Sequence, residues 1–151
     1  MGYALRSALL TVSLLAFSAC GISSPEDLAE ETLGYLVRSD FTGYFEDTVV
    51  TPSQVLEICP AIRNFSIDKG KFQERFARCL SKADFATAEL VATTPKKGFA
   101  STAECGGSEP VETADDIDVT VKTSTRVYTF KIRGALATHD GWRVANTLDC
   151  D

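Results

Sequence analysis

Residues 117–144 read IDVTVKTSTRVYTFKIRGALATHDGWRV, and this stretch decides the fold. Apolar and polar residues alternate in positions 117–121 and again in positions 128–132. A period of two is typical of a strand with one buried face. Asp140-Gly141 is a strong signal for a tight hairpin turn, and Trp142 opens a further run of strand-forming residues. The stretch therefore predicts three antiparallel strands joined as a meander.

The residues before this meander predict a further hairpin. Ala86–Thr93 and Phe99–Cys105 are rich in strand-forming residues, and they flank the turn-rich sequence Pro95-Lys96-Lys97-Gly98. An acidic, glycine-containing segment at 106–116 is expected to be a loop that leads into the meander.

The first half of the chain carries helix signals. Ser24 followed by Pro25 is a typical helix start, and this helix should run to about Arg38. Residues 40–45 predict a turn or a short helix, Thr51-Pro52 opens a short helix that Pro60 ends, and 68–82 predicts a third helix. In the third helix, one face is apolar, and we expect it to pack in the core. Its members are Phe72, Phe76, Cys79 and Leu80.

Helices followed by a run of strands indicate the α+β class. We expect a single domain over residues 24–151, with N-terminal helices packed on an antiparallel sheet of about four to five strands. The helix ending near Ser39-Asp40-Phe41 and the closing sequence 140–144 give this layout its resemblance to the cystatin-like and NTF2-like superfamilies. The NTF2-like resemblance implies a cone-shaped cavity that serves a small-molecule binder or an enzyme. Tyr44, Tyr128 and Asp118 are the candidate occupants of such a cone, although none of them matches a catalytic motif of the family.

The first 19 residues have the pattern of a signal peptide. Arg6 precedes an apolar run at 8–17, and that run is too short to cross a bilayer, which takes about 20 residues. The sequence Ala16-Phe17-Ser18-Ala19-Cys20 resembles a bacterial lipobox. The resemblance implies cleavage before Cys20, lipidation of its thiol with palmitate-type acyl chains, and a short tether at 20–23. The alternative is ordinary cleavage after Ser18, which leaves Cys20 as a free thiol.

The lipobox resemblance also predicts where the protein resides. It implies an exported protein that is lipid-anchored to the bacterial cell envelope. Because Gly21 rather than aspartate follows Cys20, the resemblance points to the outer membrane in a Gram-negative cell.

The five cysteines support this interpretation. An odd number in an exported protein leaves one thiol unpaired, and lipidation of Cys20 leaves four for two disulfides. Four cysteines allow three pairings. Because Cys59 and Cys79 lie in the helical half and Cys105 and Cys150 at predicted strand ends, we expect the pairs Cys59–Cys79 and Cys105–Cys150. The spacings contain no Cys-x-x-Cys, so a metal site is not predicted.

The chain of 151 residues is acidic, with a formal net charge of −6. Residues 1–19 hold one arginine and no acid, so the remainder has 14 basic and 21 acidic side chains and a net charge of −7. Nucleic-acid binding needs clustered lysine and arginine, so nucleic acid is excluded as a predicted partner. A basic partner is compatible with this charge.

Signals for catalysis are weak. His139 is the sole histidine and lies beside the predicted Asp140-Gly141 turn, where we expect it to be exposed. The carboxylate pairs Glu26-Asp27, Glu30-Glu31 and Asp115-Asp116 have no EF-hand spacing and are interpreted as solvated surface. No cofactor is predicted.

The expected function is therefore binding. We expect a non-catalytic interaction module, anchored to the membrane by its N-terminal lipid, whose partner is an envelope protein or an envelope polymer. The alternative is an NTF2-like small-molecule binder or enzyme. A phage-encoded or defence lipoprotein that blocks entry is a third interpretation.

Overall fold

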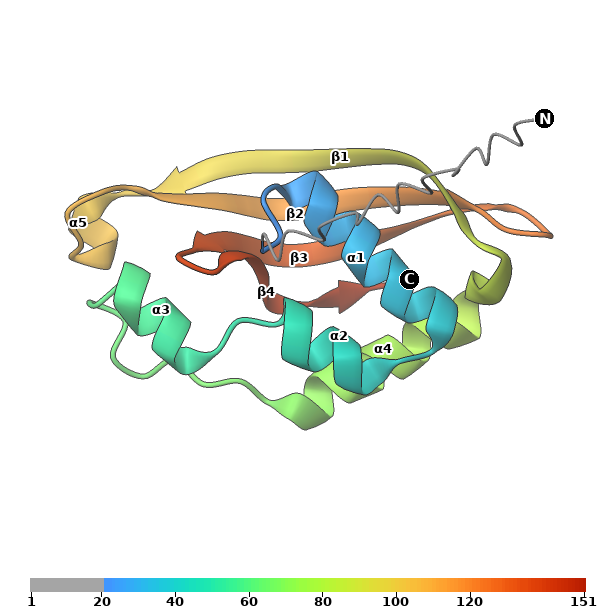
Figure 1. Ribbon diagram of the computed structural model, residues 1–151, viewed down its shortest axis with the longest axis horizontal. Helices are drawn as coiled ribbons and strands as arrows, with labels where there is room; N and C mark the ends of the chain where they lie inside the picture. Colours follow the sequence, from blue (N-terminus) through green and yellow to red (C-terminus); the bar gives the residue numbers. More distant parts are fainter. Residues whose placement is uncertain (1–20) are drawn as a thin grey trace, which may run out of the picture.

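The computed structural model describes residues 21–151, and Cys20 with the predicted signal peptide lies outside them. Helices come first and strands follow, as the sequence predicts (Figure 1). The helices are α1 (Pro25–Arg38), α2 (Phe41–Thr48), α3 (Pro52–Ile58), α4 (Lys69–Lys82) and α5 (Thr102–Cys105), with one 3-10 turn at Phe85–Thr87. The strands are β1 (Glu89–Ala100), β2 (Val111–Lys122), β3 (Val127–Thr138) and β4 (Gly141–Asp149). None of the helices in residues 21–151 is long and apolar enough to cross a membrane.

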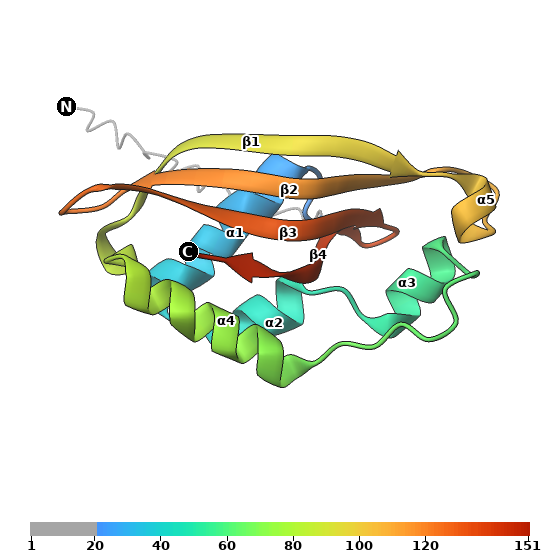
Figure 2. The same cartoon turned by 180° about the vertical axis from the view of Figure 1, so that it is seen from behind.

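The four strands form one antiparallel sheet in the order β1-β2-β3-β4, which confirms the predicted meander and the α+β class. In Figure 1, α1 lies across the front of this sheet, and in Figure 2 the strands lie in front of it. Helices α2, α3 and α4 lie along the β4 side. Within the connection between α2 and α3, the Val50 N–H donates to the Val144 carbonyl at 2.9 Å, so this connection pairs with the outer edge of β4.

Local capping explains why the helices begin where they do. The Ser24 side chain accepts a hydrogen bond from the Asp27 N–H at 3.0 Å, and Pro25 occupies the first helical position of α1. Thr51 and Gln54 form a reciprocal capping box on α3. The Asp68 carboxylate accepts from the Lys71 N–H and starts α4. Each of these starts follows from residue type alone, and each is confirmed.

The core lies between the helices and one face of the sheet. The strand residues that face it have essentially no exposed surface: Ile117, Val119, Val121, Phe130 and Ile132. From the helices, Tyr44 of α2 stacks on Phe76 of α4 with ring centroids 5.2 Å apart. Phe72, Phe76 and Cys79 of α4 are buried, as the apolar stripe predicts.

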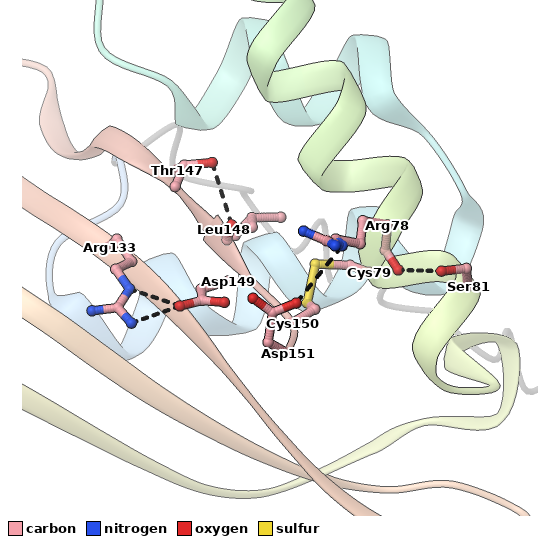
Figure 3. Close-up of a disulfide and its surroundings, with 9 residues drawn as sticks. All are labelled: Arg78, Cys79, Ser81, Arg133, Thr147, Leu148, Asp149, Cys150 and Asp151. Atoms are coloured by element: carbon pink, nitrogen blue, oxygen red, sulfur yellow. Dashed lines mark hydrogen bonds and ion pairs between the residues drawn. A yellow bond between two sulfur atoms is a disulfide. The ribbon is translucent and has the colours of Figure 1, made fainter.

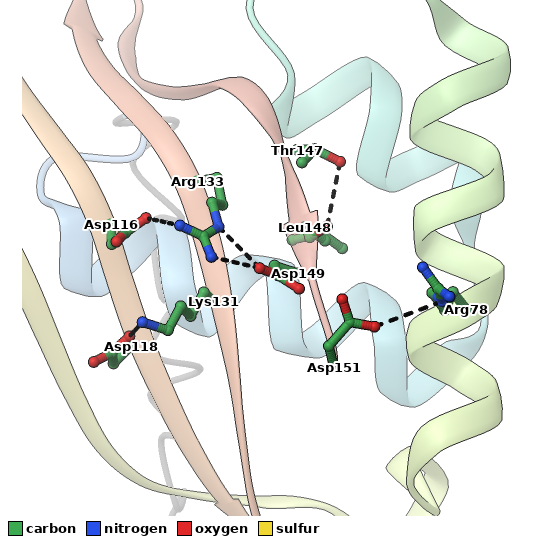
Figure 4. A network of polar contacts seen from close by, with 9 residues as sticks. All are labelled: Arg78, Asp116, Asp118, Lys131, Arg133, Thr147, Leu148, Asp149 and Asp151. Carbon is green, nitrogen blue, oxygen red and sulfur yellow. Dashed lines mark hydrogen bonds and ion pairs between the residues drawn. The ribbon is translucent and has the colours of Figure 1, made fainter.

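The opposite face of the sheet is polar (Figure 4). Arg133 donates through Nε and Nη2 to Asp149 Oδ2, at 2.9 and 2.6 Å, and through Nη1 to Asp116 at 3.3 Å. Two residues further along the same face, Lys131 pairs with Asp118 at 3.4 Å. These charges are compatible with a sheet that is covered by helices on one face and open to solvent on the other.

The predicted hairpin around Pro95-Lys96-Lys97-Gly98 is wrong. These four residues continue one strand, β1, which pairs with β2 from Glu89 to Ala100 with register shifts between Leu90 and Ala92 and between Pro95 and Lys97. Because β1 is an edge strand, it needs hydrogen-bonding partners on one side, and proline and lysine are tolerated there. The predicted second arm is wrong as well, since a Ser101–Glu104 capping box starts α5. The loop expected at 106–116 ends early, because β2 begins at Val111.

The predicted disulfide pairing is also wrong. The bonds are Cys59–Cys105, with Cα atoms 4.1 Å apart, and Cys79–Cys150, with Cα atoms 5.1 Å apart. Cys79 lies on the face of α4 that packs against the end of β4, beside Cys150 (Figure 3). Each bond therefore links the helical half to the strand half. The predicted pairing assumed that cysteines of the same half of the chain lie close together in space. In the fold, each cysteine of the strand half lies beside a cysteine of the helical half.

Candidate functional site

A groove of about 510 Å³ lies at the end of the sheet where α3 and the β3–β4 hairpin meet. We call it the acidic groove. Three exposed carboxylates line it: Glu57 from α3, Glu109 from the loop before β2, and Glu112 from the start of β2. The other lining residues are Ile58, Phe99, Gly107, Ser108, Pro110, Val111, Ala137, Thr138 and His139. Among these described residues there is no lysine or arginine to neutralise the carboxylates.

An exposed aromatic ring adjoins the acidic groove. Phe99, near the end of β1, is 70 % exposed, which is unusual for so large an apolar side chain. It also lines a second depression of about 230 Å³ together with Pro25, Glu112 and Trp142. A ring that is open to solvent between two depressions and beside carboxylates has the composition of a protein-binding surface.

One buried disulfide holds α3, the helix that contributes Glu57 and Ile58 to the acidic groove. Cys59 follows the end of α3, and its bond to Cys105 ties α3 to α5. The Ala61 N–H donates to the Cys105 carbonyl at 2.9 Å and reinforces the link. On the other side, the Gln54 side chain donates to Asp140 at 3.1 Å, so α3 is also tied to the β3–β4 hairpin. The position of Glu57 on α3 is therefore fixed from both sides.

His139 lies in the hairpin turn and is exposed at the edge of the acidic groove. Its Nδ1 is 3.5 Å from a carboxylate oxygen of Glu57, and the histidine side chain is 70 % exposed. Its exposure agrees with the expectation for a turn residue. The imidazole contacts a carboxylate, but it contacts no hydroxyl or thiol nucleophile in the described part of the chain. The His139–Glu57 pair therefore lacks the nucleophile of a catalytic triad.

The three residues predicted to occupy a cone lie apart from one another. Tyr44 is fully buried against Phe76, and burial raises the pKa of its hydroxyl. Asp118 lies on the open face of the sheet with Lys131. Tyr128 packs edge-on against Phe85, and burial raises its pKa too. None of the three lines the acidic groove or the depression beside it.

The acid pairs predicted as surface have separate local roles. Glu26 is 3.8 Å from Lys97, and Asp27 accepts a hydrogen bond from the Ser23 hydroxyl, which lowers the pKa of its carboxyl. Asp116 belongs to the Arg133 cluster on the open face. Within residues 21–151, no three histidine, cysteine or acidic side chains converge in a way that would hold a metal ion.

The acidic groove itself is not predicted from the sequence. Glu57 is far in the chain from Glu109 and Glu112, and no motif relates it to them. The acidic segment at 106–116 contains Glu109 and Glu112, but nothing in the sequence places Glu57 or Phe99 beside it. Comparison of the chain with protein-family models, curated proteins and solved structures gives no significant match.

Proposed function

We propose that this protein is an exported, lipid-anchored module of the bacterial cell envelope that binds a basic segment of a partner protein in the acidic groove. The observation that carries the binding function is the groove itself, with three exposed carboxylates beside an exposed phenylalanine on a disulfide-held frame. Carboxylates attract lysine and arginine side chains, and an exposed aromatic ring packs against their aliphatic or guanidinium groups.

The cysteines support export and lipidation. Both disulfides are buried, and together they use the four cysteines of residues 21–151. Disulfides persist in oxidising compartments outside the cytoplasm. Cys20 is then the one cysteine left over, directly after the lipobox-like sequence 16–19. Multiple acyl chains on Cys20 would anchor the domain stably, since a single chain binds membranes only marginally.

The packed interior favours this proposal over a small-molecule cavity. A cone-type site would need an open space between α1 and the sheet. Instead, fully buried side chains from both elements occupy that region, including Leu28 and Leu36 of α1 and Phe130 of β3. The acidic groove lies outside this core, at the surface, where it suits an extended chain.

Intact-mass analysis of protein extracted from bacterial membranes tests the anchoring. We expect a chain that begins at Cys20 and carries the added mass of a diacylglyceryl group and an acyl chain. An unmodified chain that begins at Ala19 would contradict the proposal.

Titration with a fluorescein-labelled, arginine-rich decapeptide tests the acidic groove. The variant Glu57→Gln/Glu109→Gln/Glu112→Gln should bind this probe about 10-fold more weakly than the parent, because it lacks the converging charges.

The matched control is Glu46→Gln/Glu74→Gln/Glu89→Gln, which removes three exposed carboxylates elsewhere. Its affinity should stay within about twofold of the parent, since charges distant from the bound peptide are screened by salt. An equal loss in both variants would show that net charge, rather than the groove, binds the peptide.

A further inference from the structure

The first described residues are docked onto the β3–β4 hairpin rather than extended away from the fold. The Trp142 N–H donates to the Ile22 carbonyl at 2.7 Å, and the Ile22 side chain packs against the core. Gly21 approaches the Asp140 carbonyl so closely that a Cβ there would collide with it. A Cβ on Gly141 would meet the Ile22 carbonyl oxygen at 2.6 Å. We call this contact of residues 21–23 with 140–142 the N-terminal clasp.

Because of the clasp, residues 21–23 do not act as the flexible tether that the sequence predicts at 20–23. Cys20 is joined directly to Gly21, and consecutive Cα atoms are about 3.8 Å apart. The point where a lipid would be attached is therefore one residue away from the contact of Gly21 with the β3–β4 hairpin. His139, at the edge of the acidic groove, belongs to the same hairpin turn.

Between the clasp and the acidic groove lie depressions that share lining residues with their neighbours. The first, of about 370 Å³, is lined by Gly21 and Ser23 together with acidic residues of α1. The second, of about 230 Å³, shares Ser23 with the first and is also lined by Phe99 and Glu112. Phe99 and Glu112 in turn line the acidic groove. The anchor point and the groove thus lie on one connected surface.

We propose that the N-terminal clasp holds the acidic groove at the membrane surface, so that its partner is a membrane-associated protein that presents a basic segment at that surface. This inference rests on the proposed function, because it takes Cys20 as the anchor and the groove as the binding site. It adds the orientation of the domain and the location of the partner.

The negative charge of this surface leaves it accessible to a protein partner. Asp27, Glu30 and Glu31 line the depression nearest the anchor. Carboxylates are not attracted to anionic lipid, so this face does not bind tightly to the bilayer. Lys97 lines the middle depression, where it is 3.8 Å from Glu26. A basic segment that approaches along the membrane meets the carboxylates of α1 near the anchor and, beyond this ion pair, those of the groove.

The β2–β3 turn provides an internal reference, because it lies at the other end of the sheet from the clasp (Figure 1). β3 joins this turn to the β3–β4 hairpin, and a strand of its 12 residues spans roughly 35 to 40 Å. Thr125 in the turn is exposed, and so is Ser108 in the acidic groove.

Energy transfer from tryptophan to a lipid-borne dansyl group measures which end is near the membrane. Trp142 is the sole tryptophan of the chain, and the clasp uses its main-chain N–H, which phenylalanine retains. The test compares Trp142→Phe/Ser108→Trp with Trp142→Phe/Thr125→Trp. Both are prepared as the chain from Cys20 onward, coupled through Cys20 to a maleimide phospholipid in dansyl-labelled vesicles. Circular dichroism confirms that each variant is folded.

Transfer from position 108 should exceed transfer from position 125 at least about twofold, because the strands separate the two ends by roughly 35 Å. Insertion of ten glycine and serine residues between Cys20 and Gly21 should abolish the difference, since such a linker reaches about 17 Å and frees the orientation. Equal transfer from both positions without the linker, or a difference that persists with it, would overturn the inference. Because the lipid is attached chemically, the result is independent of whether cells lipidate Cys20, which intact mass decides separately.

Discussion

Two tyrosine hydroxyls in the helical layer have opposite environments. Tyr35 of α1 donates a hydrogen bond to the Asp47 carboxylate. Tyr44 of α2 is buried, and its hydroxyl has no hydrogen-bond partner among the described residues. Burial raises the pKa of both hydroxyls, so both are protonated at neutral pH and the difference between them is one of hydrogen bonding.

This difference predicts opposite effects of the same substitution. Tyr44→Phe removes an unsatisfied buried hydroxyl and should leave stability unchanged or raise it by up to about 1 kcal/mol. Tyr35→Phe removes a hydrogen bond to a charged group and should cost about 1 to 2 kcal/mol. Urea unfolding of the two variants measures both effects. A larger loss for Tyr44→Phe would instead show that a bound water or ligand satisfies its hydroxyl.

Asp149 makes stability depend on acid pH. The hydrogen bond from Arg133 holds the pKa of the Asp149 carboxyl below its usual range. A lowered pKa in the folded state stabilises the fold above the unfolded value of about 3.9, and the stabilisation disappears as pH falls through the folded pKa. Asp149→Asn should thus be less stable than the parent at pH 7, and the difference should shrink as the pH falls below about 3.9. The effect should be small, because the Arg133 side chain is 40 % exposed. Thermal unfolding from pH 2 to 7 tests this, and a constant difference would contradict it.

At the scale of elements, the two disulfides have different consequences. Cys59–Cys105 joins α3 to α5 beside the acidic groove, whereas Cys79–Cys150 joins α4 to the end of β4, away from it. The bonds close loops of 46 and 71 residues, so the chain-entropy model assigns each about 4 kcal/mol.

Removal of each bond should therefore cost similar stability but affect binding differently. Cys59→Ser/Cys105→Ser should weaken binding of the arginine-rich probe, because Glu57 is no longer held beside Glu109 and Glu112. Cys79→Ser/Cys150→Ser is the control and should bind normally at temperatures where it remains folded. Peptide titration together with thermal unfolding checks both parts. Normal binding by the first variant would show that the α3 position does not depend on its disulfide.

For the whole molecule, long-range electrostatics should govern association. From Cys20 onward the chain carries a net charge of −7, and the acidic groove concentrates part of it. Raising the salt concentration from about 0.05 M to about 0.5 M shortens the Debye length to about 4 Å. The association rate of the arginine-rich probe should fall about 10-fold or more, while its dissociation rate changes less. Stopped-flow fluorescence measures both rates, and a salt-independent association rate would contradict the electrostatic account.

Local signals predicted much of the architecture. The cap-then-proline signals at Ser24 and Thr51 placed two helix starts, and the apolar face of 68–82 placed the helix that begins at Lys69. The period of two in residues 117–132 identified the strands and their buried face, and Asp140-Gly141 identified the last turn. Caps and turns depend on local backbone geometry, and the period of two depends on which side chains face the core and which face solvent. Residues close in sequence determine both.

The errors came from features that depend on distant partners. Pro95-Lys96-Lys97-Gly98 has the composition of a turn, yet it continues as an edge strand because β2 pairs with it on both sides of a register shift between Pro95 and Lys97. Cys59 and Cys79 both lie among helices, yet each bonds to a cysteine from the strand half. The acidic groove brings Glu57 to Glu109 and Glu112, and nothing in the local sequence relates position 57 to the acidic segment 106–116.

The sequence by itself determined the helix-then-strand order, the buried face of the meander, the acidic charge, and the odd cysteine after a lipobox-like sequence. Tertiary structure decided which cysteines pair, how long β1 is, and where three carboxylates and Phe99 meet. It also decided that residues 21–23 dock on the β3–β4 hairpin. The physical reason is range: caps, turns and periodicity act over a few residues, whereas a groove, a disulfide or a clasp joins segments separated by tens of residues that meet only when the core packs.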